Sequence, residues 1–226
     1  LQLEVEGARS GAGRPAVAEH QQRRLVAGPA KWPLVGPPHP DTDVWSYGGQ
    51  VPGPEIRLRQ GERLGVVLEN RLTQDTTVHW HGIRLPHAMD GVPHLTQAPV
   101  EPGQTFAYDF VCPDAGTFWY HPHVRSFEQV GRGLYGVLIV EEAEPPAVDR
   151  ELTWVLDDWR LTATAALTDD FGNPFDMSHN GQLGNTVTIN GRPIDEFLRR
   201  DWLKMILMQP LQLTDSAAKF DVAVNV

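Results

Sequence analysis

The sequence predicts an all-β protein built as a β-sandwich, and three observations support this prediction. Short segments rich in β-branched and aromatic residues recur throughout residues 24–141. Turn signals such as VPGP, RQGE, VEPGQ and PDAG separate these segments. No stretch before residue 141 sustains a helical period. These features favour an antiparallel sandwich or barrel of short strands.

The expected strands differ in how their apolar residues are arranged. EIRLR and FAYDF alternate apolar with polar residues, which is typical of a half-buried strand. GVLIV is apolar throughout, which indicates a strand that is covered on both faces. The segments expected as strands before residue 141 are RLVAG, DVWSYGG, EIRLRQ, RLGVVLEN, TTVHWHG, QTFAYDFV, GTFWYHP and LYGVLIVEE.

The chain divides into three parts by composition. Residues 1–22 are polar, small and patternless, and we expect a flexible arm there. Residues 23–143 hold the strand segments, and the acidic EEAEPPAVDR stretch then suits a linker. A second, partial unit is expected over residues 144–226. It offers ELTWVLDDWR and TVTING as strands and at most four strands in all, where a sandwich needs about seven.

Composition excludes several classes of protein. The chain has 226 residues, of which 41% are hydrophobic and 21% charged, an ordinary globular composition. Its formal net charge of −10 argues against a nucleic-acid partner. No apolar run approaches the roughly 18 residues that span a membrane. The first residues lack an initiator Met and an apolar signal core, so we expect a mature or cropped terminus.

Four of the nine histidines form two HxH pairs, His79 and His81 in TVHWHG and His121 and His123 in FWYHPHV. In a strand, residues i and i+2 share a face and lie roughly 7 Å apart. Each pair therefore offers two imidazoles to the same space, and two neighbouring strands would offer four. We interpret the pairs as a metal site.

Ligand type narrows the choice of metal. Neutral imidazole suits copper, zinc, iron and nickel, and no acidic residue lies within either pair, which argues against Ca²⁺ or Mg²⁺. Zinc stays open on ligand type alone. The other histidines are expected to be solvated or unpaired rather than ligating: His20, His39, His87, His94 and His179.

Three stretches carry a family resemblance: TVHWHG, the loop GIRLPHAMDGVPHLTQAPVEPGQTF, and DAGTFWYHPHVRSFEQVGRGLYGVLIVEE. With VPGPEIRLRQGERL upstream, they closely resemble the first cupredoxin domain of bacterial laccase-like multicopper oxidases. The resemblance extends from about residue 24 to residue 192. It implies a cupredoxin-type Greek-key β-sandwich followed by an incomplete second cupredoxin-like unit.

The resemblance also implies a copper cluster. In that family four HxH pairs hold a trinuclear cluster that reduces dioxygen to water, and the first domain supplies two of the pairs. His79 resembles a type 2 copper ligand, and His81, His121 and His123 resemble type 3 ligands. The implied partners are dioxygen, a small reductant (a phenol or a metal ion) and a missing C-terminal cupredoxin domain with the other ligands. The implied location is the periplasm or outside the cell.

Asp90, in AMDG, has two interpretations. It matches a carboxylate that in relatives lies near the cluster and helps to deliver protons, a role that fits general acid–base catalysis. An Asp-Gly turn explains the same residues without chemistry. The sequence leaves both open.

The aromatic residues next to the proposed histidine ligands are expected to support them by packing. By strand alternation we expect Trp80, Trp119 and Tyr120 to point away from the metal and hold the imidazoles in place. Pro122 cannot donate a ladder hydrogen bond, so the strand that carries His121 is expected to end there or lie at an edge.

Two features of the family are missing from this sequence. A blue-copper site needs a Cys with two His, but Cys112, the single cysteine, has no such neighbours and is expected to be a buried structural thiol. The second set of HxH pairs is also absent. From about Leu198 the chain no longer follows the family pattern, and WLKMILM is expected as a strand or short helix.

Three functions are compatible with the sequence. The first is the copper-binding portion of a multicopper oxidase, which couples oxidation of a donor to four-electron reduction of dioxygen. The second is a non-catalytic module that sequesters copper, or an inactive truncated fragment. The third is a structural protein on the same scaffold, which the intact HxH pairs disfavour.

Overall fold

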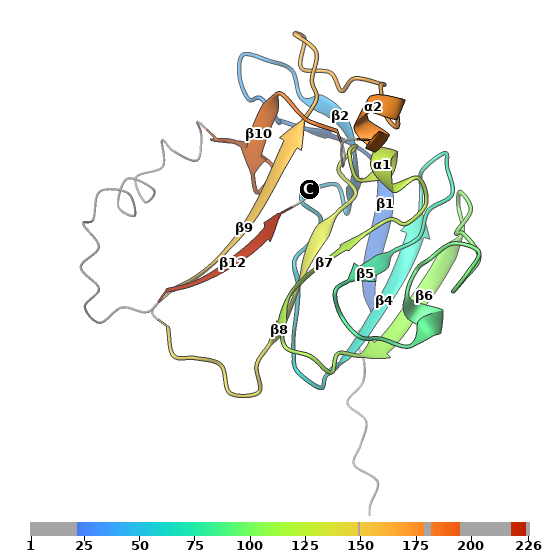
Figure 1. The fold of residues 1–226 in the computed structure, drawn as a ribbon, viewed down its shortest axis with the longest axis vertical. Coiled ribbons are helices and arrows are strands. Elements are labelled where there is room, and N and C mark those ends of the chain that lie inside the picture. Colours follow the sequence, from blue (N-terminus) through green and yellow to red (C-terminus); the bar gives the residue numbers. More distant parts are fainter. Residues whose placement is uncertain (1–21, 149, 179–181, 195–217, 225–226) are drawn as a thin grey trace, which may run out of the picture.

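A computed structural model describes residues 22–148, 150–178, 182–194 and 218–224 (Figure 1). Almost all of the regular structure in these ranges is β-strand, and the strands form three sheets of four strands each. The arm expected over residues 1–22 lies, apart from Gln22, outside the described residues, as do His20, His179 and the WLKMILM segment. None of the described helices is long and apolar enough to cross a membrane.

The first sheet has the order β2-β1-β4-β6. β1 pairs antiparallel with β2 and parallel with β4, and β4 pairs antiparallel with β6. In β4, Leu64, Val66 and Leu68 are fully buried at alternate positions, because every second side chain of a strand faces the same side. The strands of this sheet are β1 (Arg23–Trp32), β2 (Thr42–Tyr47), β4 (Arg63–Asn70) and β6 (Thr105–Val111).

The second sheet, of order β3-β8-β7-β5, packs on the first. Its strands are β3 (Ile56–Arg59), β8 (Gly136–Glu141), β7 (Gly116–His121) and β5 (His79–His81). The core between the two sheets holds an aromatic group, Tyr47, Trp80, Tyr108, Phe110 and Tyr120, all at most 1% exposed. The two sheets and this core make the predicted cupredoxin-type sandwich.

Two strand pairs differ from the antiparallel prediction. β1 runs parallel to β4, and β3 runs parallel to β8. Alternation of apolar and polar residues shows which side chains face the core, but it carries no information on the direction of the neighbouring strand. Each parallel pair joins strands that are not consecutive in the chain, as a Greek-key arrangement requires.

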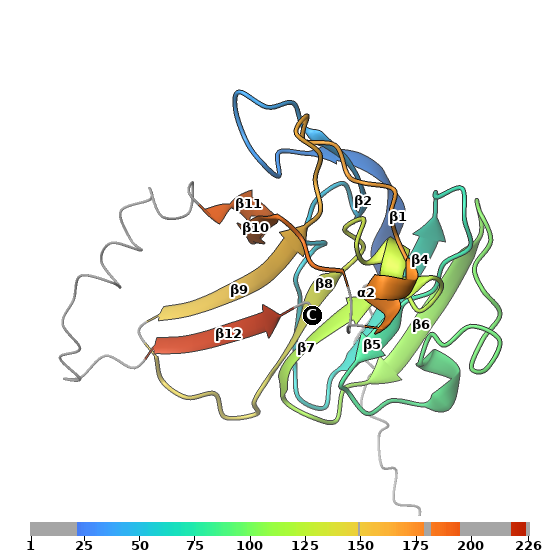
Figure 2. The same ribbon diagram turned by 45° about the horizontal axis from the view of Figure 1, so that its top comes forward.

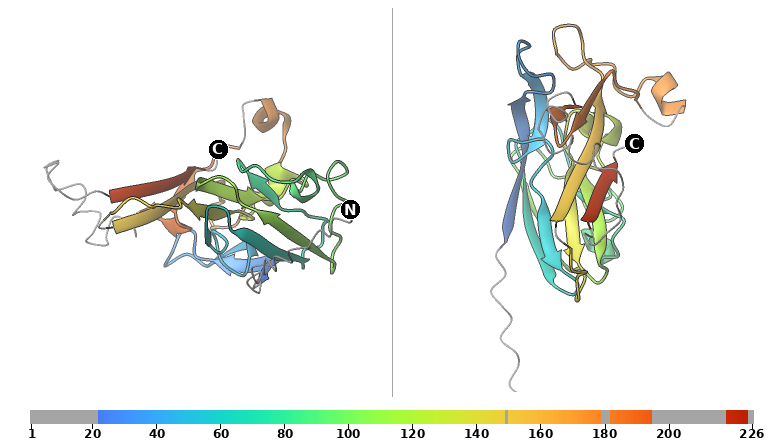
Figure 3. Two further views of the ribbon diagram at one scale, coloured as in Figure 1. Left: turned by 90° about the horizontal axis from the view of Figure 1, so that it is seen from below. Right: turned by 90° about the vertical axis from the view of Figure 1, so that its left-hand side faces the viewer.

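A third sheet, of order β11-β10-β9-β12, packs on the outer face of the second. It consists of β9 (Arg150–Trp159), β10 (Thr186–Ile189), β11 (Arg192–Pro193) and β12 (Ala218–Val224). β9 is its centre, since β10 pairs with β9 antiparallel and β12 pairs with β9 parallel. Figures 2 and 3 show β9 and β12 side by side, next to the sandwich.

β8 separates two cores, as its continuous apolar sequence predicts. Leu138 and Val140 face the inner core, whereas Val137 and Ile139 face a second core with Val155, Trp159 and Leu161. We call this second core the outer core; its other buried members are Leu34, Val44, Val51 and Tyr135. The indole of Trp159, 2% exposed, donates a hydrogen bond to Thr188 Oγ1 at 3.0 Å, which satisfies its buried N–H.

Short helices complete the described structure. A 3-10 helix, η1 (His87–Met89), follows β5, and α1 (Ser126–Gln129) follows β7. A third helix, α2 (Pro174–Ser178), lies between β9 and β10 in the chain. Both η1 and α1 therefore come directly after segments that carry HxH pairs.

Candidate metal centre

β5 and β7 bring the two HxH pairs together. The strands are antiparallel neighbours, with His79 opposite His121 and His81 opposite Trp119. Trp80 and Tyr120, between these positions, point into the inner core and are fully buried. The histidines consequently lie on the other face of the sheet, towards the outer core.

The four imidazoles form one compact group. The ring centre of His79 lies 5.5 Å from that of His81 and 5.3 Å from those of His121 and His123. Nitrogen atoms of His79, His81 and His121 all lie within 4.8 Å of one another, and His81 Nδ1 is 3.3 Å from His121 Nε2. His123 follows β7, is exposed, and has its ring centre 6.3 Å from that of His121. These separations allow several nitrogens to contact the same small volume.

Hydrogen bonds fix which nitrogen two of the rings present. His79 Nδ1 lies 2.8 Å from the main-chain oxygen of Asp90, and His121 Nδ1 lies 2.9 Å from that of Pro122. A carbonyl oxygen only accepts, so Nδ1 carries the hydrogen in both rings when they are neutral. The Nε2 lone pair of each ring is then left for a metal, the usual arrangement of ligating histidines.

The environment keeps two of these rings neutral near pH 7. Burial lowers the pKa of His121 to about 4, and the neighbouring histidines act in the same direction. The pKa of His81 is lowered as well, first by partial burial and then by the positive charges that His79 and His123 would carry. A neutral imidazole keeps the lone pair that a metal needs, so the set fits copper or zinc.

Asp90 lies beside His79 at the end of η1. Its carbonyl accepts from His79, and its carboxylate oxygen Oδ1 is 3.2 Å from the same nitrogen. The side chain is 34% exposed and so reaches water. Gly91 follows with a φ of +72°, and a Cβ there would lie 1.9 Å from the carbonyl oxygen of Val78. The close approach of this loop to the start of β5 places the Asp90 carbonyl against His79.

The predicted direction of the Trp119 side chain, away from the metal, is wrong. Its ring stacks on His121 with ring centres 4.0 Å apart and an angle of 26° between the planes. Trp119 is two residues before His121 in the same strand, so both side chains lie on the same face. The predictions that Trp80 and Tyr120 point away from the histidines are confirmed.

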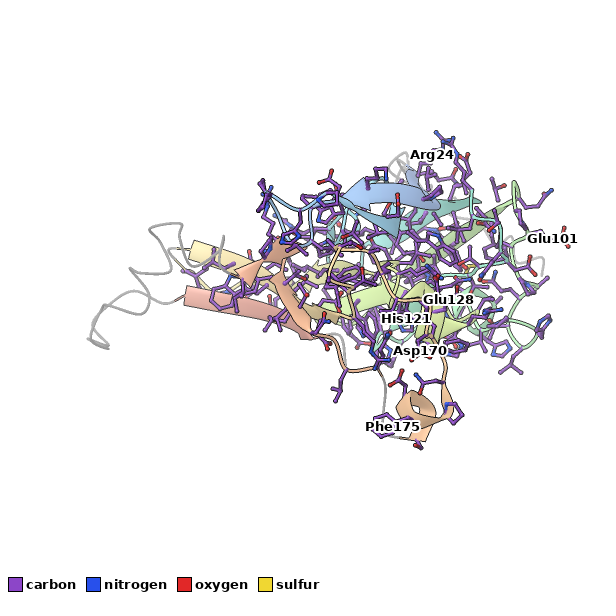
Figure 4. The ribbon with its side chains drawn as sticks, turned by 90° about the horizontal axis from the view of Figure 1, so that it is seen from above. Arg24, Glu101, His121, Glu128, Asp170 and Phe175 are labelled. Carbon is purple, nitrogen blue, oxygen red and sulfur yellow. The ribbon has the colours of Figure 1, made fainter. Side chains whose placement is uncertain are left out.

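Buried polar residues that hold the ligand segments were missed at the sequence level. The main-chain N–H of His123 donates to Thr77 Oγ1 at 3.2 Å, and Gln129 Nε2 donates to the carbonyl of Asp75 at 2.8 Å. Glu128, 6% exposed, forms ion pairs with Arg125 and Arg132. Figure 4 labels Glu128 and His121, and it shows Phe175 on α2. No periodicity marks such residues; their only signal is polar residues beside a ligand motif.

The remaining candidates lie elsewhere. His39, His87 and His94 are exposed, as predicted, and do not belong to the cluster of ligand nitrogens. Cys112 is fully buried in the inner core, and burial raises the pKa of its thiol to about 11. The prediction of a structural thiol is confirmed. β7 ends at His121, immediately before Pro122, as expected.

Comparison with known proteins gives two matches to family models. The model described as multicopper oxidase matches residues 32–145. The model described as ribosomal protein S9/S16 matches residues 176–226. The segment that departs from the oxidase pattern from about Leu198 thus resembles a second family. The range that this second model matches includes β10, β11 and β12.

Individual relatives agree with the first match. Copper resistance protein A of Pseudomonas syringae pv. tomato is 38% identical over 80% of this chain and 30% of that protein. Multicopper oxidase MmcO of Mycobacterium tuberculosis is 41% identical over 69% of this chain and 29% of that protein. The chain thus spans about 30% of the length of these curated relatives.

A solved structure shows the same architecture. The multi-copper oxidase from Pseudomonas thermotolerans is 48% identical and superimposes with a TM-score of 0.72. The match covers 76% of this chain and 41% of that one. A family model that spans half of the sequence, relatives of this similarity and a shared fold lead to one conclusion: the chain belongs to the multicopper oxidase family.

Proposed function

We propose that His79, His81, His121 and His123 hold copper and supply half of the ligands of a trinuclear cluster. The assembled enzyme would couple oxidation of a donor to the four-electron reduction of dioxygen to water. One observation carries the proposal: three ligand nitrogens from two neighbouring strands lie within 4.8 Å of one another. Family membership selects copper over zinc, which the imidazoles alone also accommodate.

The residues of this chain would prepare the ligands before copper binds. The carbonyls of Asp90 and Pro122 hold Nδ1–H of His79 and His121, so neither ring rotates or changes tautomer when it binds. Burial keeps His121 neutral near pH 7, so copper does not have to displace a proton there. When bound, copper would store the electrons that dioxygen receives.

Asp90 would exchange protons between water and the cluster. Its carboxylate is 34% exposed and lies 3.2 Å from His79 Nδ1, so it contacts both water and a ligand. Reduction of dioxygen to water consumes protons, and a carboxylate in this position suits general acid–base catalysis. The Asp90 carbonyl holds His79 independently, so Asp90→Asn separates the two roles: it removes the carboxylate and keeps the carbonyl.

The proposed partners follow from the family. They are dioxygen, a small reductant (a phenol or a low-valent metal ion) and a polypeptide with the other HxH pairs, which corresponds to the C-terminal cupredoxin domain of relatives. We place the protein in the periplasm or outside the cell, since relatives include copper resistance proteins. Neither a nucleic acid nor a membrane is among the proposed partners.

Copper stoichiometry of the full chain tests the proposal. We expect bound copper, measured by elemental analysis after gel filtration, to fall in His79→Ala and His121→Ala. His87→Ala is the matched control, because His87 is exposed and outside the cluster. Unchanged copper in His79→Ala and His121→Ala would exclude this site.

A second function is favoured by the ligand count. The chain has two HxH pairs, and its one cysteine is buried away from them. A copper-sequestering module would bind copper with these pairs and consume no oxygen. Oxygen uptake by copper-loaded protein with a phenol separates the two functions. Uptake that appears only after a polypeptide with the other pairs is added supports the oxidase, and copper binding without uptake in either case supports sequestration.

A further inference from the structure

Trp119 contacts two of the proposed ligands from two different strands. It stacks on His121, which is two residues further along β7, with ring centres 4.0 Å apart. It also lies opposite His81 in the β5–β7 register, where the ring centres are 5.1 Å apart at 34° between the planes. One indole therefore lies against both imidazoles.

His81 is the ligand that most needs such a contact. The main-chain carbonyls of Asp90 and Pro122 orient His79 and His121. Among the residues that the structure describes, the hydrogen-bond partner of the His81 ring is another ligand, His121, at 3.3 Å. A metal that binds both rings would replace this hydrogen bond. The stacked indole would then remain to define the plane of the His81 ring.

Trp119 also packs against other residues of the protein. It packs against the outer core, and in the sheet it lies opposite Val137 of β8. This core also contains Trp159 and Val155 of β9, so the third sheet contributes to the core against which the indole packs. A side chain that packs against a core and also against two imidazoles has little freedom to rotate.

We propose that Trp119 is a positioning residue, which sets the planes of His81 and His121 through stacking and thereby sets the strength and geometry of copper binding. This proposal rests on the proposed function, because copper is its readout. It makes Trp119 a link between the packing of the third sheet and the metal centre.

Copper affinity and the electron paramagnetic resonance spectrum of the Cu²⁺-loaded full chain test the proposal. Trp119→Leu and Trp119→Met remove the flat ring, and Met refills much of the volume if Leu impairs folding. We expect both to weaken copper binding about 10–100-fold, the effect typical of residues that orient ligands. Both should also change the hyperfine splitting of the spectrum. Trp119→Phe keeps a stacking ring and should restore affinity to within about threefold of the original.

Phe118→Leu is the matched control. Phe118 is the preceding residue of β7, also aromatic, and packs against the inner core. We expect Phe118→Leu to lower the unfolding temperature about as much as Trp119→Leu but to leave copper affinity and the spectrum unchanged.

Two results would overturn the proposal. One is original affinity and spectrum in both Trp119→Leu and Trp119→Met, and the other is an equal loss of affinity in Phe118→Leu. Failure of the proposed function looks different, because copper would then also persist in His121→Ala.

Discussion

Thr76 Oγ1 donates a hydrogen bond to Gln129 Oε1 across 2.7 Å, and both residues are fully buried. Thr76 precedes β5 by three residues, and Gln129 ends α1, which follows His123. The side chain of Gln129 also donates to the carbonyl of Asp75 at 2.8 Å. These bonds join the segments that carry the two HxH pairs, at a place where water cannot replace a lost partner.

Thr76→Val is expected to destabilise the protein by about 1–3 kcal/mol, the cost of a buried acceptor left without its donor. Valine has nearly the shape of threonine, so packing should be preserved. Thr76→Ser retains the hydroxyl and should recover most of the loss. Denaturant unfolding measures the change, with Thr105→Val, at an exposed position of β6, as the control. If Thr76→Val and Thr105→Val have equal effects, the hydrogen bond contributes nothing.

Gly91→Ala is expected to be far more damaging than Gly103→Ala. Both glycines have positive φ, +72° and +81°, so alanine pays the left-handed cost of about 1–2 kcal/mol at either position. Only at Gly91 would the new Cβ meet a backbone oxygen, 1.9 Å away, whereas Gly103 faces open space. The loop would have to move, and the Asp90 carbonyl would leave His79.

Two measurements compare these glycine variants. Gly91→Ala should lose more than about 4 kcal/mol of unfolding free energy, a magnitude reserved for severe structural conflicts. It should also bind copper more weakly, whereas Gly103→Ala should bind copper like the original protein. Equal copper affinity in the two variants would show that the Asp90 loop does not position His79.

Cys112 is expected to resist thiol reagents in the folded protein. Burial raises the pKa of its thiol to about 11, and the thiolate is the reactive form. At pH 8 we expect no reaction with a disulfide reagent over minutes, and one equivalent after unfolding in guanidinium. Rapid reaction of the native protein would contradict the burial of this residue.

The same thiol should make stability fall at high pH. The folded state holds the proton more tightly than the unfolded state, whose pKa is near 9.0. The stability that this thiol contributes is therefore complete below pH 9 and is lost as the pH rises towards 11, by up to about 3 kcal/mol. Unfolding free energies of the original protein and Cys112→Ala, measured from pH 8 to 11, should converge as the pH rises.

Copper is expected to stabilise the fold. A ligand that binds only the folded state adds about 2.7 kcal/mol at a free concentration 100 times its dissociation constant. Calorimetry should show a higher unfolding temperature with Cu²⁺ and a return to the original value after chelation. In His79→Ala the rise should shrink, while in His87→Ala it should be preserved. A rise of the same size in both variants would place the copper elsewhere.

The strands and the grouping of the histidines were predictable from the sequence because both depend on alternation. RLGVVLEN became β4 and LYGVLIVEE contains β8, with the alternate or continuous burial that their patterns indicate. The HxH spacing placed His79 and His81 on one face of β5, and in the sheet His121 of β7 lies on the same face. Strand direction was not predictable, which is why the parallel pairs β1–β4 and β3–β8 were missed.

Contacts between residues of different strands could not be predicted from the sequence either. The direction of the Trp119 side chain was predicted wrongly, although alternation places it on the face of His121. Trp80 and Tyr120, which were grouped with it in the prediction, do face the core. Thr76 and Gln129 are far apart in the sequence, and only the folded chain brings them together. The likeness of the C-terminal segment to a second family was not predictable from periodicity, because periodicity indicates secondary structure and not ancestry.

The outer core couples the unfolding of the sandwich to the unfolding of β9. Val137 and Ile139 of the sandwich share that core with Val155, Trp159 and Leu161, so detachment of β9 would strip apolar cover from β8. Each large side chain exposed in this way costs about 1.5–3 kcal/mol, which penalises any half-open species. Melting should therefore be a single cooperative event for sandwich and β9 together, and a protease would find no stable intermediate to trim between them.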